Sequence, residues 1–206
     1  MAISERQKRE KEARKELILS SAIKTFTELG YHNASMDLIA EVAELGKSTL
    51  YYYYKSKKEL LAAVLEKGIV DFFNMLEYEW QHIDDPIQKI KLVTITAAHF
   101  FSTNKDYFRF YTYLSSHPYL RKNLTENYRL FLSKKLNLID SQFKEAMRKN
   151  LIKPFNRKEL LEIFGSLVMG IGVLSDKNVS KKSLLRKAKM INDIFLKGIL
   201  KPGVGK

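Results

Sequence analysis

The sequence of 206 residues contains no cysteine, only four prolines and only four histidines. The absence of cysteine excludes a disulfide framework, a thiolate zinc site and a cysteine nucleophile. The histidines match no metal-ligand spacing, so we expect no metal site; they are His32, His82, His99 and His117. The longest apolar stretch, near 167–174, is far shorter than the ~20 residues that span a membrane.

Signals for targeting and for catalysis are also missing. The charged N-terminus shows no signal-peptide pattern, which favours a cytoplasmic protein. No glycine-rich phosphate loop, serine nucleophile elbow or pair of catalytic carboxylates stands out. We therefore expect no cofactor and no enzyme. An all-helical enzyme whose N-terminal part serves only as a scaffold is the other possibility. It would need a convergent set of catalytic residues, which the sequence does not offer.

Charge is abundant but unevenly distributed. The net charge is +13, yet residues 1–60 hold eleven Lys and Arg against nine Asp and Glu. Residues 61–206 hold twenty-five against fourteen, so most of the excess lies in the larger part of the chain. A lysine-rich solvated surface and the binding of an anionic ligand or extra phosphates both explain this excess.

Apolar residues recur at helical spacing along the chain, and no strand pattern or internal repeat is found. In the first stripe, Ile18, Ala22 and Phe26 precede Gly30, a helix C-terminal cap, and Ser35 can cap the next helix. Asp85-Pro86 is a typical helix start. The spacing predicts about nine helices, near 18–29, 36–43, 47–54, 57–76, 86–101, 107–113, 119–148, 157–174 and 184–199.

Residues 47–58 are the most informative segment, because hydroxyl groups and lysines crowd there (KSTLYYYYKSKK). Leu50 and Tyr54 share the inner face of the expected short helix, whereas Lys47, Ser48, Tyr51 and Tyr52 face outward. Phenols and ammonium groups bind phosphates and reach base edges. A helix, a tight turn near Gly46 and this second helix indicate a helix-turn-helix for the DNA major groove.

The same residues resemble the tetracycline-repressor (TetR) family. The resemblance rests on Leu29-Gly-Tyr31, Ser35, Ile39-Ala40, Thr49-Leu-Tyr51 and Lys57-x-x-Leu60, and covers about residues 15–65. It implies an all-α fold in two parts. An N-terminal arm and a three-helix helix-turn-helix DNA-binding head occupy residues 1–56. A larger C-terminal helical body for ligand binding and dimerisation occupies residues 57–206.

The resemblance also implies roles for individual residues. Lys47, Ser48, Thr49 and Tyr52 would meet base edges or nearby backbone. The residues that would hold phosphates are Ser35, Tyr51, Tyr53 and Lys57. From the sequence alone, Tyr53 is equally compatible with packing. The arm between residues 6 and 15 is compatible with DNA contact by its arginines and with a solvated extension.

Three departures from the family pattern stand out. Glu44 occupies a turn position where the family usually has glycine, so we expect this turn to be strained or shifted toward Gly46. Ser48 stands where glycine is common, which alters the approach of the backbone to DNA. Tyr54 replaces a usual phenylalanine, and its hydroxyl needs a partner or a path to solvent.

The body is rich in aromatic residues, which predicts an elongated apolar pocket for a small hydrophobic effector, fatty-acyl or aromatic. The candidate ligand-binding residues are Phe72, Thr96, His99, Phe100, Tyr107, Phe108, Tyr111, Tyr128 and Phe164. In the family the last two helices of each subunit form the dimer interface. The candidate dimerisation residues are Leu167, Ile171, Leu184, Ala188, Ile191 and Phe195.

The sequence therefore predicts a homodimeric regulator of transcription, a repressor that binds a double-stranded operator and is released from it by the effector. An activator, or a protein that organises chromosomal DNA without an inducer, is the alternative.

Overall fold

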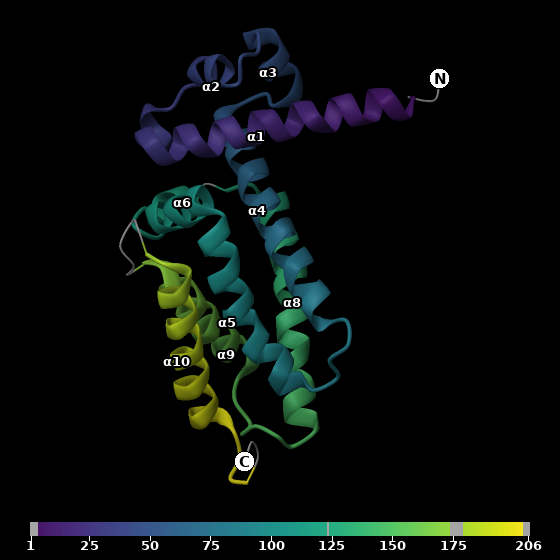
Figure 1. Cartoon of the computed structure of the whole chain (residues 1–206), viewed down its shortest axis with the longest axis vertical. Coiled ribbons are helices and arrows are strands. Elements are labelled where there is room, and N and C mark those ends of the chain that lie inside the picture. Colours follow the sequence, from purple (N-terminus) through teal and green to yellow (C-terminus); the bar gives the residue numbers. More distant parts are fainter. Residues whose placement is uncertain (1–3, 123, 174–178, 204–206) are drawn as a thin grey trace. The chain divides into compact units, whose positions relative to one another are not determined.

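The computed structural model describes residues 4–122, 124–173 and 179–203 of the chain. These residues are almost entirely helical and contain no strand, only one isolated bridge between Ile152 and Leu200. They form ten helices (Figure 1): α1 (Glu5–Asn33), α2 (Met36–Val42), α3 (Lys47–Tyr53), α4 (Lys57–Trp80), α5 (Pro86–Thr103), α6 (Lys105–Ser115), α7 (Pro118–Lys122), α8 (Glu126–Arg148), α9 (Arg157–Val173) and α10 (Lys181–Ile199). The all-α prediction is confirmed.

The tenth helix arises from a break that the sequence did not predict. One helix was expected over 119–148, but the chain forms α7 and α8 there. The hydroxyl of Thr125 accepts a hydrogen bond from the Tyr128 N–H at 3.2 Å, which caps the start of α8. A side chain that satisfies a free amide in this way favours a new helix start over a continuous helix. The expected end of the eighth predicted helix, Leu174, lies outside the described residues.

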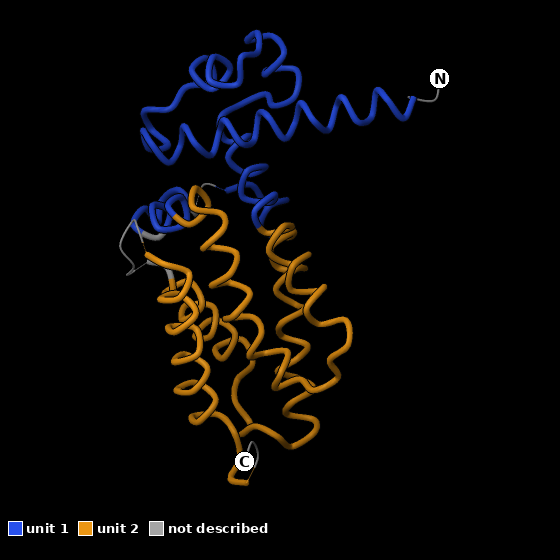
Figure 2. Tube along the Cα trace, in the orientation of Figure 1, with its two compact units in different colours: residues 1–68, 109–129 blue, residues 69–108, 130–206 orange. Residues whose placement is uncertain are grey.

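Two compact units make up the chain, coloured separately in Figure 2. Residues 1–68 and 109–129 form the first unit, and residues 69–108 and 130–206 form the second. The boundary between the units falls inside α4, α6 and α8, so each of these helices contributes residues to both.

The first unit is built around α1. Its predicted apolar stripe is buried, with Ile18, Ala22 and Phe26 fully inaccessible to solvent. Phe26 stacks on Phe110 of α6 with ring centroids 5.7 Å apart. Helix α1 packs on α2, and α2 packs on α3. These three helices therefore share one small core.

Gly30 breaks α1 at the position where the sequence predicts a helix end. Its backbone has φ 76° and ψ 155°, a conformation that only glycine adopts readily. A further turn, residues 31–33, follows before the chain enters α2. Ser35 then caps α2 as predicted, because its Oγ accepts a hydrogen bond from the Leu38 N–H at 3.1 Å.

The turn between α2 and α3 is bent at Glu44 and not at Gly46. Glu44 has φ +52°, in the left-handed region, whereas Gly46 has φ −62° and serves as the N-terminal cap of α3. The N–H of Glu44 donates to the Glu41 carbonyl at 2.9 Å, and that of Leu45 donates to the Ala40 carbonyl at 2.9 Å. Of the two outcomes expected for this turn, the structure has the strained one.

The second unit has α5, α9 and α10 packed together at its centre. Asp85 caps α5 and Pro86 occupies its first turn, as predicted. The Asn192 side chain on α10 donates to the Lys91 carbonyl of α5 at 3.0 Å, which ties these helices together inside the core.

No helix within residues 4–122, 124–173 and 179–203 has the length and apolar character needed to pass through a bilayer.

Replacing Glu44 by glycine is expected to stabilise the protein. Glycine adopts the left-handed conformation without the side-chain clash, and part of this gain is offset by its greater freedom in the unfolded chain. We expect a net gain of about 1 kcal/mol, or about 2–4 °C in Tm for a chain of this size. Thermal unfolding followed by circular dichroism measures it.

Glu44→Ala is the matched control, because it removes the same exposed side chain but keeps a residue that is strained at positive φ. It should show no such gain. Equal Tm values for Glu44→Gly and Glu44→Ala would contradict the strain at this turn.

Candidate nucleic-acid interface

The direction of α3 is fixed by one buried face. Leu50 is 0% exposed and Tyr54, directly after the helix, is also buried. These two residues are four apart, so they lie on the same side of the helix, as the sequence predicted. The opposite side carries Tyr51 and Tyr52, which are both exposed, Tyr52 to 68%. The helix thus exposes two phenol side chains to solvent, while Leu50 and Tyr54 hold its other side in the core.

Tyr54 is held as a neutral phenol. Burial, together with the nearby carboxylates of Glu12, Glu16, Glu59 and Glu66, raises its pKa to about 12. Its hydroxyl therefore stays protonated at physiological pH, and the residue acts as part of the core. This agrees with its predicted inward orientation.

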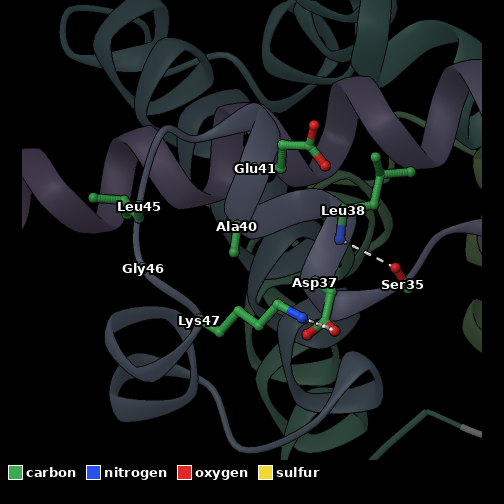
Figure 3. A pocket seen from close by; sticks show the side chains of 8 residues that line it. All are labelled: Ser35, Asp37, Leu38, Ala40, Glu41, Leu45, Gly46 and Lys47. Carbon is green, nitrogen blue, oxygen red and sulfur yellow. Dashed lines mark hydrogen bonds and ion pairs between the residues drawn. The ribbon is translucent and has the colours of Figure 1, made fainter.

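Lys47 lies at the start of α3 and forms an ion pair across the turn. Its Nζ is 2.5 Å from Oδ2 of Asp37, in the first turn of α2 (Figure 3). The hydrogen bond and the charge of Asp37 raise the pKa of the Lys47 ammonium. Both side chains are more than half exposed, so the pair is open to competition from other anions.

An open groove of about 530 Å³ lies beside this ion pair, between α2 and the start of α3. Figure 3 shows the carboxylate of Glu41 and the Asp37–Lys47 pair at its wall. The residues that line it are Ser35, Asp37, Leu38, Ala40, Glu41, Leu45, Gly46 and Lys47. Because hydrogen-bond acceptors and one ammonium meet here, the groove can accept as well as donate hydrogen bonds.

Other predicted DNA-binding residues are distributed around this face. Ser48 is exposed, while Thr49 and Tyr53 are half-buried. The ring of Tyr53 meets that of Tyr52 edge to face, with centroids 5.3 Å apart. Ser35 is exposed although its Oγ already caps α2. The structure thus brings Ser35, Lys47 and the outer side of α3 into one compact unit.

Lys57 is engaged elsewhere. Its Nζ donates to the carbonyls of Tyr31, His32 and Ala34 at 2.8, 3.2 and 2.7 Å. The ammonium also lies 4.6 Å from the centroid of the Tyr31 ring. Partial burial lowers its pKa. An ammonium has three N–H donors, so a phosphate contact would have to replace one of these carbonyls. The predicted phosphate role of Lys57 stays a prediction, and the geometry gives the residue a structural task at the end of α1.

The predicted ligand-binding residues fall into separate groups. In the second unit, the Phe100 ring lies 6.0 Å from that of Phe72 and 5.9 Å from that of Tyr107. Phe108 joins the same group through Phe101, at 5.8 Å. Thr96 is buried and His99 is half-buried on the same helix, α5.

The three remaining candidates are divided between the two units. Phe164 packs on Phe143 and Phe195, with centroids 5.5 and 4.9 Å apart. Tyr111 and Tyr128 belong to the first unit, where burial raises the pKa of Tyr128. The nine candidates thus belong to two units, and four of them, Phe72, Phe100, Tyr107 and Phe108, belong to the ring cluster around Phe100.

Most predicted dimerisation residues face the interior of their own subunit. Ile171, Leu184 and Ala188 are essentially inaccessible, and Phe195 is buried against Phe164. Leu167 and Ile191 are half-buried. The exposed apolar side chains of α9 and α10 are others, namely Ile163, Met190 and Ile194. The role of the predicted set in contact with a second subunit stays a prediction, and in the single subunit only Leu167 and Ile191 of the set are partly accessible.

Asp37 and Glu41 are the residues of this face that sequence reasoning missed. Asp37 was interpreted only as a favourable charge in the first turn of α2. The ten residues that separate it from Lys47 gave no local signal, since the contact exists only after the turn at Glu44 has brought the helix starts together. The described residues contain no cluster of His, Asp or Glu suited to a metal ion.

The chain is similar to known proteins in two ways. Residues 18–64 match the family model described as bacterial regulatory proteins, tetR family. A stretch of 47 residues, 23% of this chain, is 51% identical to the HTH-type transcriptional regulator YhgD of Bacillus subtilis and covers 25% of that protein. The chain spans about a quarter of the length of the first curated relatives it matches.

Solved structures extend the likeness to the whole fold. The regulator FadR of Bacillus subtilis in complex with stearoyl-CoA matches 89% of this chain and 98% of its own, with a TM-score of 0.75 and 17% identity. AibR in complex with isovaleryl coenzyme A and operator DNA matches 88% and 97%, with a TM-score of 0.70 and 19% identity. At these identities the structures show a shared fold.

Proposed function

We propose that this chain, which belongs to the TetR family of bacterial regulatory proteins, is a sequence-specific DNA-binding repressor released from its operator by a small ligand. The observation that carries the proposal is the anchored α3, whose buried Leu50 leaves Tyr51 and Tyr52 exposed. A short helix presented in this way fits the major groove. The proposal includes a cytoplasmic location and no enzymatic activity.

Base edges would be met by the N-terminal part of α3. Lys47 and Ser48 are exposed, and Thr49 and Tyr52 lie on the same short helix. Lysine donates to guanine O6 and N7, and hydroxyls accept from or donate to any base. Tyr51, Tyr53 and the hydroxyl of Ser35 would hold the phosphates beside the groove. Lys57 keeps its role at the end of α1.

The effector proposed is a fatty-acyl compound, with its chain among the aromatic rings around Phe100. FadR and AibR, which share the fold, were solved with acyl-CoA compounds. The lysine excess of residues 61–206 suits the phosphates of such a ligand. The ligand would act by binding one of two conformations more tightly, since equal affinity for both shifts nothing.

A homodimer is part of the proposal, because a two-fold operator requires two copies of α3. Helices α9 and α10 pack together, and each carries exposed apolar side chains. Met190 and Ile194 are four residues apart on α10 and so share one face; Ile163 adds an exposed side chain on α9. We place the subunit contact on this outer face.

Tyr52→Ala is expected to weaken binding to the preferred DNA sequence by about tenfold or more, since one contact at a base edge is worth about 1–3 kcal/mol. A duplex enriched by the wild-type protein from a random-sequence pool serves as the probe, and fluorescence anisotropy gives the Kd. Tyr78→Ala is the control, because Tyr78 is a tyrosine exposed to a similar extent, 71%, on α4. Equal affinities for the two variants would count against reading by α3.

Ile194→Asp is expected to convert a dimer into monomers, because it places a charge in the proposed apolar contact. Ile194 is 68% exposed in the single subunit, so the fold should tolerate the change. Light scattering after gel filtration gives the mass. Leu130→Asp, on α8 and 57% exposed, is the control and should leave the dimer intact. A monomeric wild type, or equal dissociation by both variants, would refute this interface.

A panel of acyl-CoA compounds, from short to long chains, tests the effector. A compound present at about 100 times its Kd stabilises the folded state by about 2.7 kcal/mol, which raises Tm by several degrees. The same compound should weaken DNA binding at least tenfold, and free coenzyme A should do neither. If no compound in the panel alters Tm or DNA affinity, the result favours the alternative function. That alternative is an activator, or a protein that organises chromosomal DNA without an inducer.

A further inference from the structure

The segment that reads DNA in the proposed function is short of positive charge. Residues 35–54 contain one lysine, Lys47, against three carboxylates, Asp37, Glu41 and Glu44. The lysine is itself paired with Asp37. DNA carries one negative charge per ~1.7 Å of helix axis, and neutralising phosphates supplies most non-specific affinity. The hydroxyls of this segment can contact phosphates but cannot neutralise them, so cations for further phosphate contacts must come from a neighbouring part of the first unit.

The lysines that follow α3 supply only part of that charge. Lys57 donates all three of its N–H groups to backbone carbonyls. Lys55 and Lys58 are exposed and remain available at the start of α4. Beyond these, the largest group of basic side chains in the first unit lies at the opposite end of its sequence, in α1.

The first part of α1, residues 5–16, is a helix that the rest of the unit leaves mostly uncovered; only at its end is Lys15 half-buried and Glu16 paired with Lys67 of α4, at 3.6 Å. We call it the arm. Every side chain from Glu5 to Arg14 is exposed, and Figure 1 shows this end of α1 continuing past α3. Its start is fixed by a capping box, in which Ser4 Oγ accepts from the Gln7 N–H and the Gln7 side chain accepts from the Ser4 N–H. The arm is therefore ordered before any partner binds.

The arm carries six basic residues and four acidic ones, and their pairing is uneven. Ion pairs join Arg6 to Glu10, Lys8 to Glu5 and Lys15 to Glu12, at 2.8, 3.5 and 2.9 Å. Within the described residues, Lys11 and Arg14 form neither an ion pair nor a side-chain hydrogen bond, whereas Arg9, which also forms no ion pair, donates to the Glu5 carbonyl at 3.4 Å. Lys11 and Arg14 are three residues apart, so they lie on one face of the helix.

That face of the arm continues the face of α1 that packs into the first unit. Ile18 and Ser21 follow Lys11 and Arg14 at a spacing of seven residues, and both are buried. The side of the arm that carries the two unpaired cations therefore points in the same direction as the side on which the rest of the unit lies. Arg6 and Arg9 lie on the solvent side, in line with Ala13 and Ser20.

We propose that the arm is a second DNA contact, in which Lys11 and Arg14 bind backbone phosphates of the duplex beside the site read by α3. The proposal rests on the function proposed above. An ordered helix with two unpaired cations meets a polyanion at little entropic cost, because the backbone is already fixed. The reading segment then determines sequence with few charges of its own, and the arm supplies affinity that does not depend on sequence.

The variant Lys11→Gln/Arg14→Gln tests the arm. Each phosphate contact adds about 0.9 to the slope of log K against log salt concentration. The double variant should flatten this slope by about 1–2 for each bound subunit and weaken binding roughly tenfold or more at ~0.15 M salt. Glutamine keeps the helix propensity, which circular dichroism confirms. The probe is the duplex enriched by the wild-type protein, placed in the middle of a longer DNA so that flanking backbone is present.

Arg6→Gln/Arg9→Gln is the matched control, with the same loss of charge from the solvent side of the same arm. It should leave the slope within about 0.5 of wild type, well under one phosphate contact. Equal slopes for wild type and Lys11→Gln/Arg14→Gln, or equal losses in both double variants, would overturn the proposal. Failure of the function itself looks different: the wild-type protein would then enrich no sequence, and Tyr52→Ala would bind as wild type does.

Discussion

The burial of Leu50 is the contact on which the presented face of α3 depends. A helix of seven residues is too short to persist alone in water, so its existence and its direction both come from tertiary packing. Leu50 and Tyr54 lie four residues apart and are both buried, which fixes the rotation of the helix about its axis. Tyr51 and Tyr52 are exposed because Leu50 and Tyr54 hold the other side of the helix in the core.

The packing of α3 depends on α2, which in turn packs on α1. Ile18, Ala22 and Phe26 are fully buried, and the break at Gly30 returns the chain toward α2. Lys57 ties the start of α4 to the same place by donating to three carbonyls between Tyr31 and Ala34. Removing that ammonium would leave the end of α1 without partners for these carbonyls. The rigidity of the presented face therefore depends on a residue that does not belong to it.

Much of the fold could be predicted because the sequence signals for it are local. Caps such as Ser35 and Asp85 act within three residues, and an apolar stripe such as Ile18, Ala22 and Phe26 is visible in the sequence itself. The strained turn at Glu44 was predicted as one of two outcomes, because positive φ is a property of a single residue. The existence of the helices and the inner side of α3 followed from these signals.

What could not be predicted depends on distant contacts. Helices α9 and α10 are apolar on more than one side, and periodicity does not distinguish a face that fills the core from one that stays exposed. The sequence stripe selected Leu184 and Ala188, which fill the core, whereas Met190 and Ile194 remain outside. The family resemblance assigned Lys57 to phosphate, and its carbonyl partners gave no local signal because they lie 23–26 residues away in the sequence.

The charge pattern of the first unit follows from how specificity and affinity are separated. A basic reading helix would bind any duplex, because phosphates are the same in every sequence. In residues 35–54 the only lysine is held by Asp37, and an exposed ion pair contributes little to stability. In the proposed function, Lys47 would leave Asp37 for a base edge at small cost, while Asp37 and Glu41 would disfavour sites where phosphate approaches them. Cations that bind the phosphates of the DNA backbone are better placed outside this segment, where they add affinity without lowering sequence specificity.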